Sequence, residues 1–176
     1  MGERPQQLAN LEHLGDAIRF APQIHALIPR CDLLENFSHA EVRLLAHFME
    51  VFRAEPGMEL IREGEGGDFM LMIIEGRVDV HKRDRWNTSQ LIAVVDAGKT
   101  LGEMSMIDGE PRFATCVATE TTVLAVLHRD NMAKIILDHP SLGSKILVKL
   151  VSMLSARLRQ TSQKLVSYMD REQEQR

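Results

Sequence analysis

Cysteine is scarce in this 176-residue chain, which contains only Cys31 and Cys116. The two lie far apart in the sequence, and neither has a partner at the spacing of metal ligands. We therefore expect a reduced intracellular protein with small, partly buried thiols. A single redox-sensitive bridge between the two thiols is the alternative.

Long hydrophobic runs are also missing. The longest apolar run, Phe69 to Ile74, is far too short to span a bilayer, and the N-terminal segment lacks the continuous apolar core of a signal peptide. The sequence thus predicts a cytoplasmic protein without membrane attachment. A chain of this length buries about 70% of its extended surface on folding, which suffices for one domain that needs neither disulfides nor metal.

Positive charge is not in excess, because the formal net charge is −4. Proteins that hold nucleic acids by their phosphates need a surplus of Lys and Arg, so general nucleic-acid affinity is not expected. We interpret the basic residues of the C-terminal segment as a solvated helix face, not as a DNA-binding stripe: Lys145, Lys149, Arg157, Arg159 and Lys164. No helix-turn-helix pattern follows them, so direct DNA binding is not expected.

The sequence shows no arrangement of residues that is typical of a catalytic or metal-binding site. The seven histidines form no His-x-His pair on a predicted strand and have no carboxylate at ligand spacing, which disfavours a metal enzyme of the cupin type. No Ser-His-Asp or Cys-His set stands in an activating context. We expect no metal, no catalytic residue and no enzymatic activity.

What the chain does contain is a change of hydrophobic period that divides it into three zones. Up to about Glu55, apolar residues recur at helical spacing over Leu8 to Ile18 and again over Leu33 to Met49, so this zone is predicted to be helical. Within it, Ser38 and the following Glu41 form the start of a capping box.

In the second zone, from Pro56 to about Leu127, short apolar runs alternate with Gly, Asp and Asn turns. The predicted strands are Met58–Ile61, Phe69–Glu75, Arg77–His81, Leu91–Val95, Phe113–Ala118 and Thr122–Leu127. Such a series predicts an antiparallel β-roll. The expected fold class is α+β, a jelly-roll-like β-roll flanked by N-terminal helices and a long C-terminal helix.

The third zone is helical again. Asp130 is the expected cap of a short helix that ends near His139, and a long helix follows from Pro140. Along it, residues recur in steps of four and three, which indicates a heptad seam and a parallel homodimer. The seam residues are Leu147, Val151, Leu154, Leu158, Thr161, Leu165 and Tyr168. A helix packed on its own domain is the alternative, and Leu150 and Met153 beside the seam are expected to face the roll.

One loop, GEMSMIDGEPRFATCVA from Gly102 to Ala118, combines a carboxylate and a guanidinium with small residues. Glu103 is placed to accept a hydrogen bond from a sugar hydroxyl, and Arg112 can form a charge-assisted pair with a phosphate oxygen. The pattern predicts recognition of ribose and phosphate without catalysis. The alternative is a surface turn with an ordinary ion pair worth about 0 to 1 kcal/mol.

A second stretch, LIREGEGGDFMLMIIEG from Leu60 to Gly76, combines a glycine-rich turn with an apolar strand. The two stretches together resemble the paired signatures of cyclic nucleotide-binding domains, over about residues 33–168. The glycines at that family's β-roll turns are Gly57, Gly64, Gly67 and Gly76. The loop matches the second signature at Gly102, Glu103, Ser105, Pro111, Arg112, Ala114, Thr115 and Ala118. It departs at Phe113, where the family has Ser, Thr or Ala, and more mildly at Cys116.

The resemblance implies a cyclic nucleotide ligand, cAMP or a related molecule, and no other cofactor. The implied ligand-binding residues are Gly102, Glu103, Met104, Ser105, Arg112, Phe113, Ala114, Ile92, Val95, Thr161 and Ser162, with Ile92, Val95 and Met104 as apolar walls. In the cAMP receptor protein a Thr-Ser pair contacts adenine. By that resemblance Thr161 contacts the base in its own subunit and Ser162 contacts that of the partner, which favours adenine and links ligand binding to dimerisation.

Phe113 leaves the ligand open, because a ring turned into the pocket either stacks on the base or blocks the phosphate site. If the ring points outward, only the backbone amide of Phe113 affects ligand binding. The leading hypothesis is a cAMP sensor that signals through its dimer helix to an unidentified partner protein, with the segment from Leu8 to Ile18 as a candidate docking surface. The alternative is a non-catalytic interaction module with altered or lost specificity, for example for a cyclic dinucleotide.

The expected organisation follows from these zones. Residues 1–30 form an N-terminal helical extension, residues 31–139 the cyclic nucleotide-binding β-roll with its flanking helices, and residues 140–176 the dimerisation helix with a polar tail.

Overall fold

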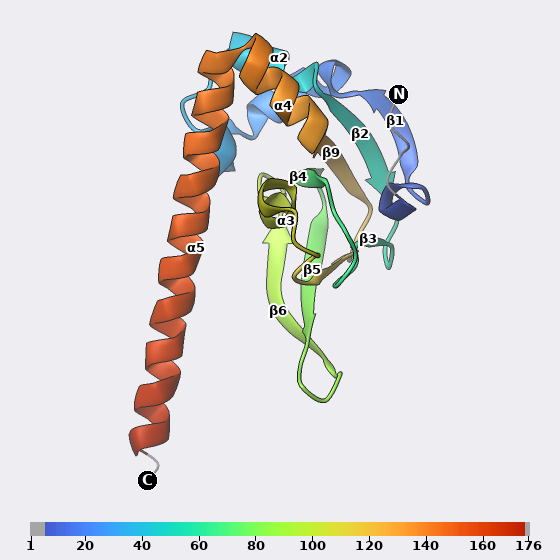
Figure 1. Ribbon diagram of the computed structural model, residues 1–176. Coiled ribbons are helices and arrows are strands. Elements are labelled where there is room, and N and C mark those ends of the chain that lie inside the picture. The colour runs from blue at the N-terminus through green and yellow to red at the C-terminus, as the bar shows by residue number, and fades with distance from the viewer. Residues whose placement is uncertain (1–5, 175–176) are drawn as a thin grey trace.

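Two antiparallel β-sheets pack face to face in the computed structural model, which describes residues 6–174 (Figure 1). The first sheet has the strand order β1-β2-β9-β4-β7 and the second the order β3-β8-β5-β6. The strands are β1 Glu12–Asp16, β2 Met49–Ala54, β3 Glu59–Ile61, β4 Phe69–Glu75, β5 Arg77–Arg83, β6 Ser89–Asp96, β7 Thr100–Leu101, β8 Thr115–Ala118 and β9 Thr122–His128. The expected antiparallel β-roll is confirmed, and every strand predicted in the second zone is present.

Strand β4 shows how the apolar core divides into two layers. Successive side chains of a strand point to opposite faces of its sheet. Phe69 and Leu71 therefore lie in the apolar cluster between the two sheets, while Met70 and Met72 lie in a second cluster on the other face. All four are fully buried. A strand covered on both faces needs a continuous apolar run, which explains the sequence of β4.

Helices close this second cluster on the outer face of the first sheet. The helices are α1 Ala21–Ala26, α2 His39–Ala46, α3 Glu103–Asp108, α4 Arg129–Asp138 and α5 Pro140–Glu174, with short 3-10 turns η1 Gln6–Leu8, η2 Ala17–Phe20, η3 Ile28–Arg30 and η4 Asp32–Leu34. The capping box is confirmed, because Ser38 Oγ accepts from the Glu41 amide at 3.2 Å and the Glu41 carboxylate accepts from the Ser38 amide at 2.8 Å.

The predicted cap of α4 is wrong. The capping position is taken by His128, which makes no side-chain cap bond, and Asp130 lies inside the first turn of the helix. A carboxylate in the first turn is still favourable there, because the helix dipole is positive at that end. Asp130 thus stabilises the start of α4 through its charge and not through a cap.

The N-terminal zone is not helical throughout, contrary to expectation. It contributes β1 and β2, which pair antiparallel at one edge of the first sheet. Leu8 and Leu11 lie in the cluster between the sheets, whereas Leu14 and Ile18 pack against the helix-covered cluster. Their helical spacing therefore does not correspond to one helix face. Gly15, at φ +108°, lies in β1 beside a register shift.

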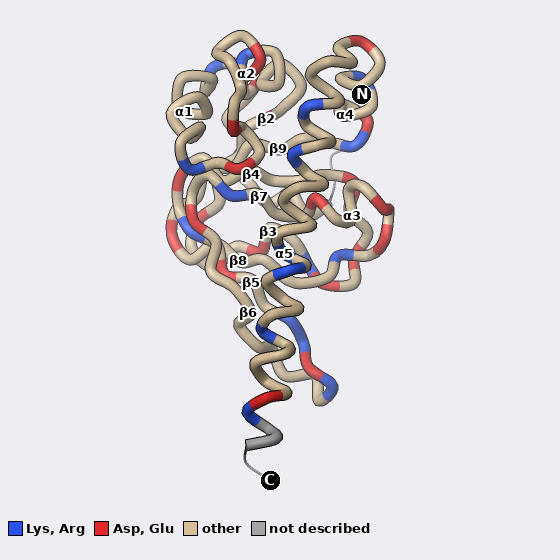
Figure 2. Tube along the Cα trace, turned by 90° about the vertical axis from the view of Figure 1, so that its left-hand side faces the viewer, with Lys and Arg blue, Asp and Glu red and all other residues tan. Residues whose placement is uncertain are grey.

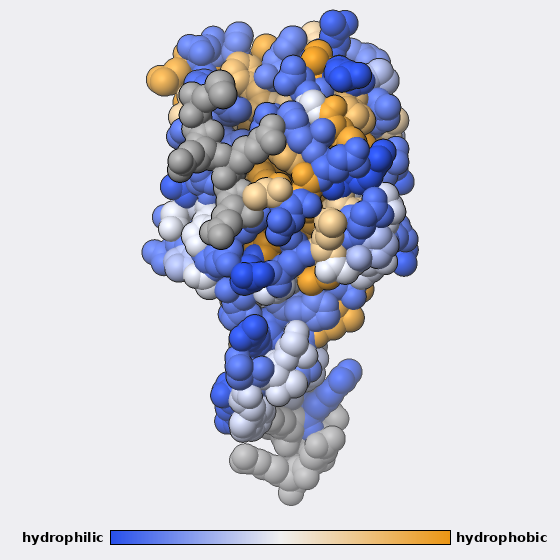
Figure 3. All heavy atoms as spheres, turned by 90° about the vertical axis from the view of Figure 1, so that its right-hand side faces the viewer, coloured by the Kyte–Doolittle hydropathy of each residue, from blue (hydrophilic) through white to orange (hydrophobic). Residues whose placement is uncertain are grey.

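The face of the molecule on the β1 side is mainly hydrophilic, with hydrophobic residues in small separate areas (Figure 3). Among the helices within residues 6–174, none combines the length and hydrophobicity needed to cross a membrane. Residues 1–5 of the expected N-terminal extension and residues 175–176 of the expected polar tail lie outside the described residues. The described part of that tail continues α5 as helix.

Helix α5 is packed on the domain over its first half and extends away from it over its second (Figure 1). Leu142, Ile146, Leu150 and Met153 are buried, as expected for the last two. From Leu158 to residue 171 every side chain is exposed. The first half therefore fixes the direction in which the exposed half projects.

The basic residues of α5 only partly form the solvated face that was expected. Lys145 Nζ donates to both carboxylate oxygens of Glu41, at 2.9 and 2.8 Å, and this bond lowers the pKa of Glu41. Lys149 pairs with Glu35. Both ion pairs hold α5 to the segment around α2. The basic positions are separated by uncharged residues along α5, and the acidic positions of the helix come only near its C-terminal end (Figure 2).

Candidate functional site

Gly102 shapes the start of helix α3. It precedes Glu103 with φ +79°, in the left-handed region that glycine adopts without steric cost. A Cβ at this position would lie 2.5 Å from Nη1 of Arg112 and 3.0 Å from Cδ1 of Ile61. Glycine is therefore needed here both for its backbone conformation and for the close approach of Arg112.

Arg112 is buried and held from several sides. Its Nη1 donates to the carbonyl of Gly102 at 2.9 Å, and its Cζ lies 4.3 Å from the ring centroid of Phe69. The backbone is fixed as well, because the Arg112 amide donates to the carbonyl of Glu65 at 2.8 Å and its carbonyl accepts from the amide of Gly64 at 2.8 Å. The loop and the glycine-rich turn, recognised separately in the sequence, thus form one structure around this guanidinium.

Three buried polar atoms of Arg112 and Glu103 have no hydrogen-bond partner in the described part of the chain. They are Nε and Nη2 of Arg112 and Oε2 of Glu103. Burial raises the pKa of the Glu103 carboxyl against the opposing charges of Arg157 and Arg112. Burial also lowers the pKa of the Arg112 guanidinium. Because buried polar groups in proteins are nearly always hydrogen-bonded, these donors and this acceptor indicate a ligand with both anionic oxygens and hydroxyl groups.

Arg157 of α5 also contacts this site, so the prediction of a purely solvated residue holds only in part: its side chain is 45% exposed. Its Nη1 pairs with Oε1 of Glu103, and its Nη2 donates to the carbonyl of Thr100 at 3.0 Å. One signal was present in the sequence. Arg157 lies four residues before Thr161 and therefore on the same face of the helix.

Arg129, at the start of α4, was not predicted either. Its guanidinium donates to the carbonyls of Met106 at 2.6 Å and Ser105 at 2.5 Å, and its amide donates to the carbonyl of Asp68 at 2.7 Å. These bonds tie α3 and the glycine-rich turn to α4. The site is thus joined to both C-terminal helices, through Arg129 and Arg157.

The structure brings Gly102, Glu103 and Arg112 together, as predicted. Of the other predicted residues, Ser105 and Ala114 are close to these three in sequence and are buried. Met104 on α3 is 47% exposed, Ile92 on β6 is 46% exposed, and Val95 on β6 is half-buried. Thr161 and Ser162 are exposed on α5. Within residues 6–174 of this single chain, neither Thr161 nor Ser162 makes a side-chain hydrogen bond to the residues around Arg112.

Phe113 has its ring 57% exposed, with Nζ of Lys82 4.6 Å from the ring centroid. The same Lys82 Nζ donates to Glu63 at 2.6 Å. The ring therefore packs under a cation that is itself fixed by an ion pair. This places Phe113 against the β5 side chain Lys82, not over the guanidinium of Arg112, whose ring contact is Phe69.

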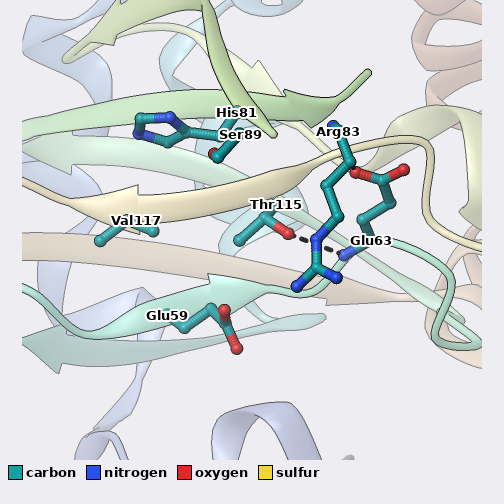
Figure 4. A pocket seen from close by; sticks show the side chains of 7 residues that line it. All are labelled: Glu59, Glu63, His81, Arg83, Ser89, Thr115 and Val117. Carbon is teal, nitrogen blue, oxygen red and sulfur yellow. Dashed lines mark hydrogen bonds between the residues drawn. The ribbon is translucent and has the colours of Figure 1, made fainter. Parts of the chain in front are cut away.

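A separate hollow of about 290 Å³ lies on the second sheet, between residues such as Glu59, Glu63 and His81 (Figure 4). Its carboxylates already have partners, because Glu63 accepts from Lys82 and from the amide of Arg83 at 3.0 Å, and Glu59 pairs with an arginine. Unlike the site around Arg112, it presents no buried polar atom without a partner among the described residues. It is therefore not the candidate ligand site.

The β-roll and its buried Arg–Glu site define a ligand-binding domain of the kind that encloses a small anionic molecule. The family model described as "Cyclic nucleotide-binding domain" matches residues 51–139, just over half of the chain. The chain belongs to the cyclic nucleotide-binding domain family.

Two similar solved structures each cover more than three quarters of the chain. A cyclic nucleotide-binding domain from Methylobacillus flagellatus is 36% identical, with 94% of this chain and 96% of that one covered and a TM-score of 0.84. The catabolite activator protein of Thermus thermophilus is 25% identical, with coverage of 76% and 61% and a TM-score of 0.70.

Two curated relatives are regulatory proteins. A cAMP-dependent protein kinase regulatory subunit of Blastocladiella emersonii is 29% identical over 68% of this chain and 30% of its own length. A CRP-like cAMP-activated global transcriptional regulator of Mycobacterium tuberculosis is 26% identical over 79% of this chain and 60% of its own length. The chain thus matches less than two thirds of each of these longer proteins.

Proposed function

We propose that this chain is a cAMP sensor that binds the nucleotide at Arg112 and Glu103 and signals through α5 to a partner protein. The observation that carries the proposal is the set of buried atoms without partners. Arg112 Nε and Nη2 are donors suited to phosphate oxygens, and Glu103 Oε2 is an acceptor suited to a ribose hydroxyl. A cyclic nucleotide presents these two groups on adjacent parts of one rigid molecule, and the names of both curated relatives include cAMP.

Apart from Phe113, each predicted residue has a binding role in this proposal and none has a catalytic one. Arg112 neutralises the phosphate, and the backbone amides of Ser105 and Ala114 face it. Glu103 binds the sugar. The side chains of Ile92, Val95 and Met104 border the sugar and base, and Gly102 allows the ligand to approach the backbone. The residues bind and orient, and no bond of the nucleotide is broken.

Arg157 gives the ligand a means of acting on α5. A ribose hydroxyl bound to Glu103 shares the carboxylate with Arg157, so the free energy of ligand binding depends on where α5 places that guanidinium. A ligand shifts a conformational equilibrium only through such a difference in interaction between two states. The contact between Glu103 and Arg157 is therefore the proposed route from the pocket to the helix.

The dimer is part of the proposal. Seam residues on the outer half of α5 are exposed in the single chain, with Leu158 at 69%, Leu165 at 60% and Tyr168 at 65%. An apolar seam of this extent is favourable only when a second helix covers it. In the dimer, Thr161 contacts the adenine bound in its own subunit and Ser162 that of the partner subunit.

Phe113 supports a second candidate, a domain with altered nucleotide specificity such as a cyclic dinucleotide receptor. Where the family has a small residue next to the arginine, this chain has an exposed ring beneath Lys82. The exposed ring is then available to stack on a second base beyond the site of Arg112.

Calorimetric titration with cAMP, cGMP and a cyclic dinucleotide separates the two candidates. We expect cAMP to bind most tightly, and Arg112→Ala to weaken it by about 1.5 to 3 kcal/mol, roughly ten- to a hundredfold, because a charge-assisted contact is lost. The control is Arg62→Ala, which removes an exposed arginine paired with Glu59 and Glu65. Preferential binding of the dinucleotide supports the second candidate, and binding of none of the three ligands refutes both.

A further inference from the structure

A groove of about 530 Å³ lies between η2, α1 and α2, away from the nucleotide site (α1 and α2 are labelled in Figure 2). Its floor is apolar, with Ala21 and Val42 buried and Ile18 half-buried. Its rim carries Arg19 and Arg43. No acidic residue lines it, although the chain as a whole has a net charge of −4.

The two arginines of this rim differ from most others in the chain. Within the described residues, neither Arg19 nor Arg43 has a carboxylate at ion-pair distance or a side-chain hydrogen bond, whereas Arg53, Arg62 and Arg77 are paired with acidic residues at the surface. An unpaired guanidinium presents its full set of donors in a planar fork that fits a carboxylate. The rim is therefore free to take carboxylates from outside the chain.

Two histidines add further donors to the groove. The rings of His25 and His39 stack with their centroids 3.3 Å apart and an interplanar angle of 13°. Stacking leaves the ring edges, which carry the nitrogen atoms, directed away from each other's faces. Each imidazole has at least one N–H in any charge state, so each can donate to a carboxylate oxygen.

The charge and shape of this groove specify its occupant. We propose that it docks an acidic segment of a partner protein, in which carboxylates flank an apolar side chain. The carboxylates pair with Arg19 and Arg43, and the apolar side chain packs on Val42. The site is distinct from the nucleotide pocket, and the proposal does not depend on cAMP being the ligand.

The hollow on the second sheet serves as an internal comparison. It is lined by both acidic and basic residues, and Glu63 is already bound by Lys82 and the Arg83 amide. An acidic segment approaching it would meet carboxylates of the same sign. Of these two hollows, only the groove at α1 and α2 is lined by charged residues of one sign, and its two arginines have no acidic partner among the described residues.

Fluorescence anisotropy with the full chain tests the proposal. The probe is a short labelled peptide in which a leucine is flanked on each side by glutamates, and the comparison peptide has glutamine in place of glutamate. We expect saturable binding of the glutamate peptide, weaker binding of the glutamine peptide, and a loss of affinity as salt is raised, because exposed charges are screened.

Charge reversal locates the binding. Arg19→Glu with Arg43→Glu is expected to lower the affinity of the glutamate peptide by about tenfold or more, because two charge-assisted contacts become repulsions. Arg159→Glu with Arg171→Glu makes the same change of net charge at exposed positions of α5 and should leave the affinity unchanged. Arg19→Gln with Arg43→Gln should weaken binding without adding repulsion, and it tests the proposal even if the charge-reversal variant misfolds. Circular dichroism checks the folding of all three double variants.

Three outcomes overturn the proposal: equal affinity for the two peptides, equal losses in the α1–α2 and α5 double variants, or no binding of either peptide. Binding of phosphatidylserine vesicles through the same arginines, without peptide binding, assigns the groove to a membrane surface instead and also overturns it. Arg112→Ala should bind the peptide normally, so failure here and failure of the proposed nucleotide site are distinguishable.

Discussion

At Gly67 the absence of a side chain determines where Arg112 lies. A Cβ at this position would overlap Nε and Cζ of that guanidinium, whereas a Cβ at the neighbouring Gly66 would meet no atom within 4 Å. Gly67→Ala is therefore expected to displace Arg112 and lower cAMP affinity about tenfold or more, the loss of one charge-assisted contact. Gly66→Ala should bind normally. Titration calorimetry checks both, and wild-type affinity of Gly67→Ala would show that the displaced guanidinium is not needed for binding.

The residues of the site differ in how far the sequence can predict them. Gly102, Glu103 and Arg112 lie within one short loop, so their proximity follows from local spacing alone. Arg157 is separated from Glu103 by 54 positions, and its contact depends on how α5 folds back along the roll. The exposure of Phe113 also depends on tertiary packing, because alternation along a strand does not reveal which face Lys82 covers.

Among the elements, α4 and α5 are packed closely enough to require a glycine. A Cβ at Gly143 would lie 2.8 Å from the Cα of Ile136, a backbone atom that cannot move independently of α4. Alanine has the better helix propensity by up to about 1 kcal/mol. Overpacking costs about 1 to 3 kcal/mol, so the clash should outweigh this gain.

We therefore expect Gly143→Ala to lower the free energy of unfolding by about 1 kcal/mol or more, as measured by urea denaturation. Ser144→Ala, at an exposed position one residue further, should be neutral or slightly stabilising. A stabilised Gly143→Ala would mean that α4 and α5 separate without cost, and that α5 is not fixed by its contact with α4.

Elements with a strong local pattern were predicted well. Several strands of the roll are bounded by glycine turns, and the capping box marked the start of α2. The helix prediction for the N-terminal segment failed because Leu8 and Leu14 pack in two different apolar clusters. Their spacing in the sequence nevertheless resembled that of residues on one helix face. Spacing in the sequence cannot distinguish one helix face from two separate packing surfaces, because the difference depends on which residues each side chain contacts in the folded chain.

For the whole molecule, α5 connects the candidate nucleotide site with the proposed dimer seam. Its 35 residues extend about 50 Å. Lys145 and Lys149 fix its first half to the domain, Arg157 contacts the site at Glu103, and the exposed seam lies beyond. Because one continuous helix carries all three, the proposed mechanism requires that a ligand which moves Arg157 also moves the second half of α5, which carries the outer seam residues. Ligand affinity and helix arrangement are then coupled in both directions.

The last prediction tests this coupling through the seam. Leu158→Lys places a charge in the proposed apolar interface between two α5 helices, where its desolvation is unfavourable, and we expect monomers in sedimentation equilibrium. Val166→Lys is the control, because Val166 is 56% exposed but lies outside the seam. The monomer should also bind cAMP more weakly, since Ser162 of the partner subunit no longer reaches the base. A dimer that persists in Leu158→Lys places the interface elsewhere, and a monomer with full affinity separates dimerisation from ligand binding.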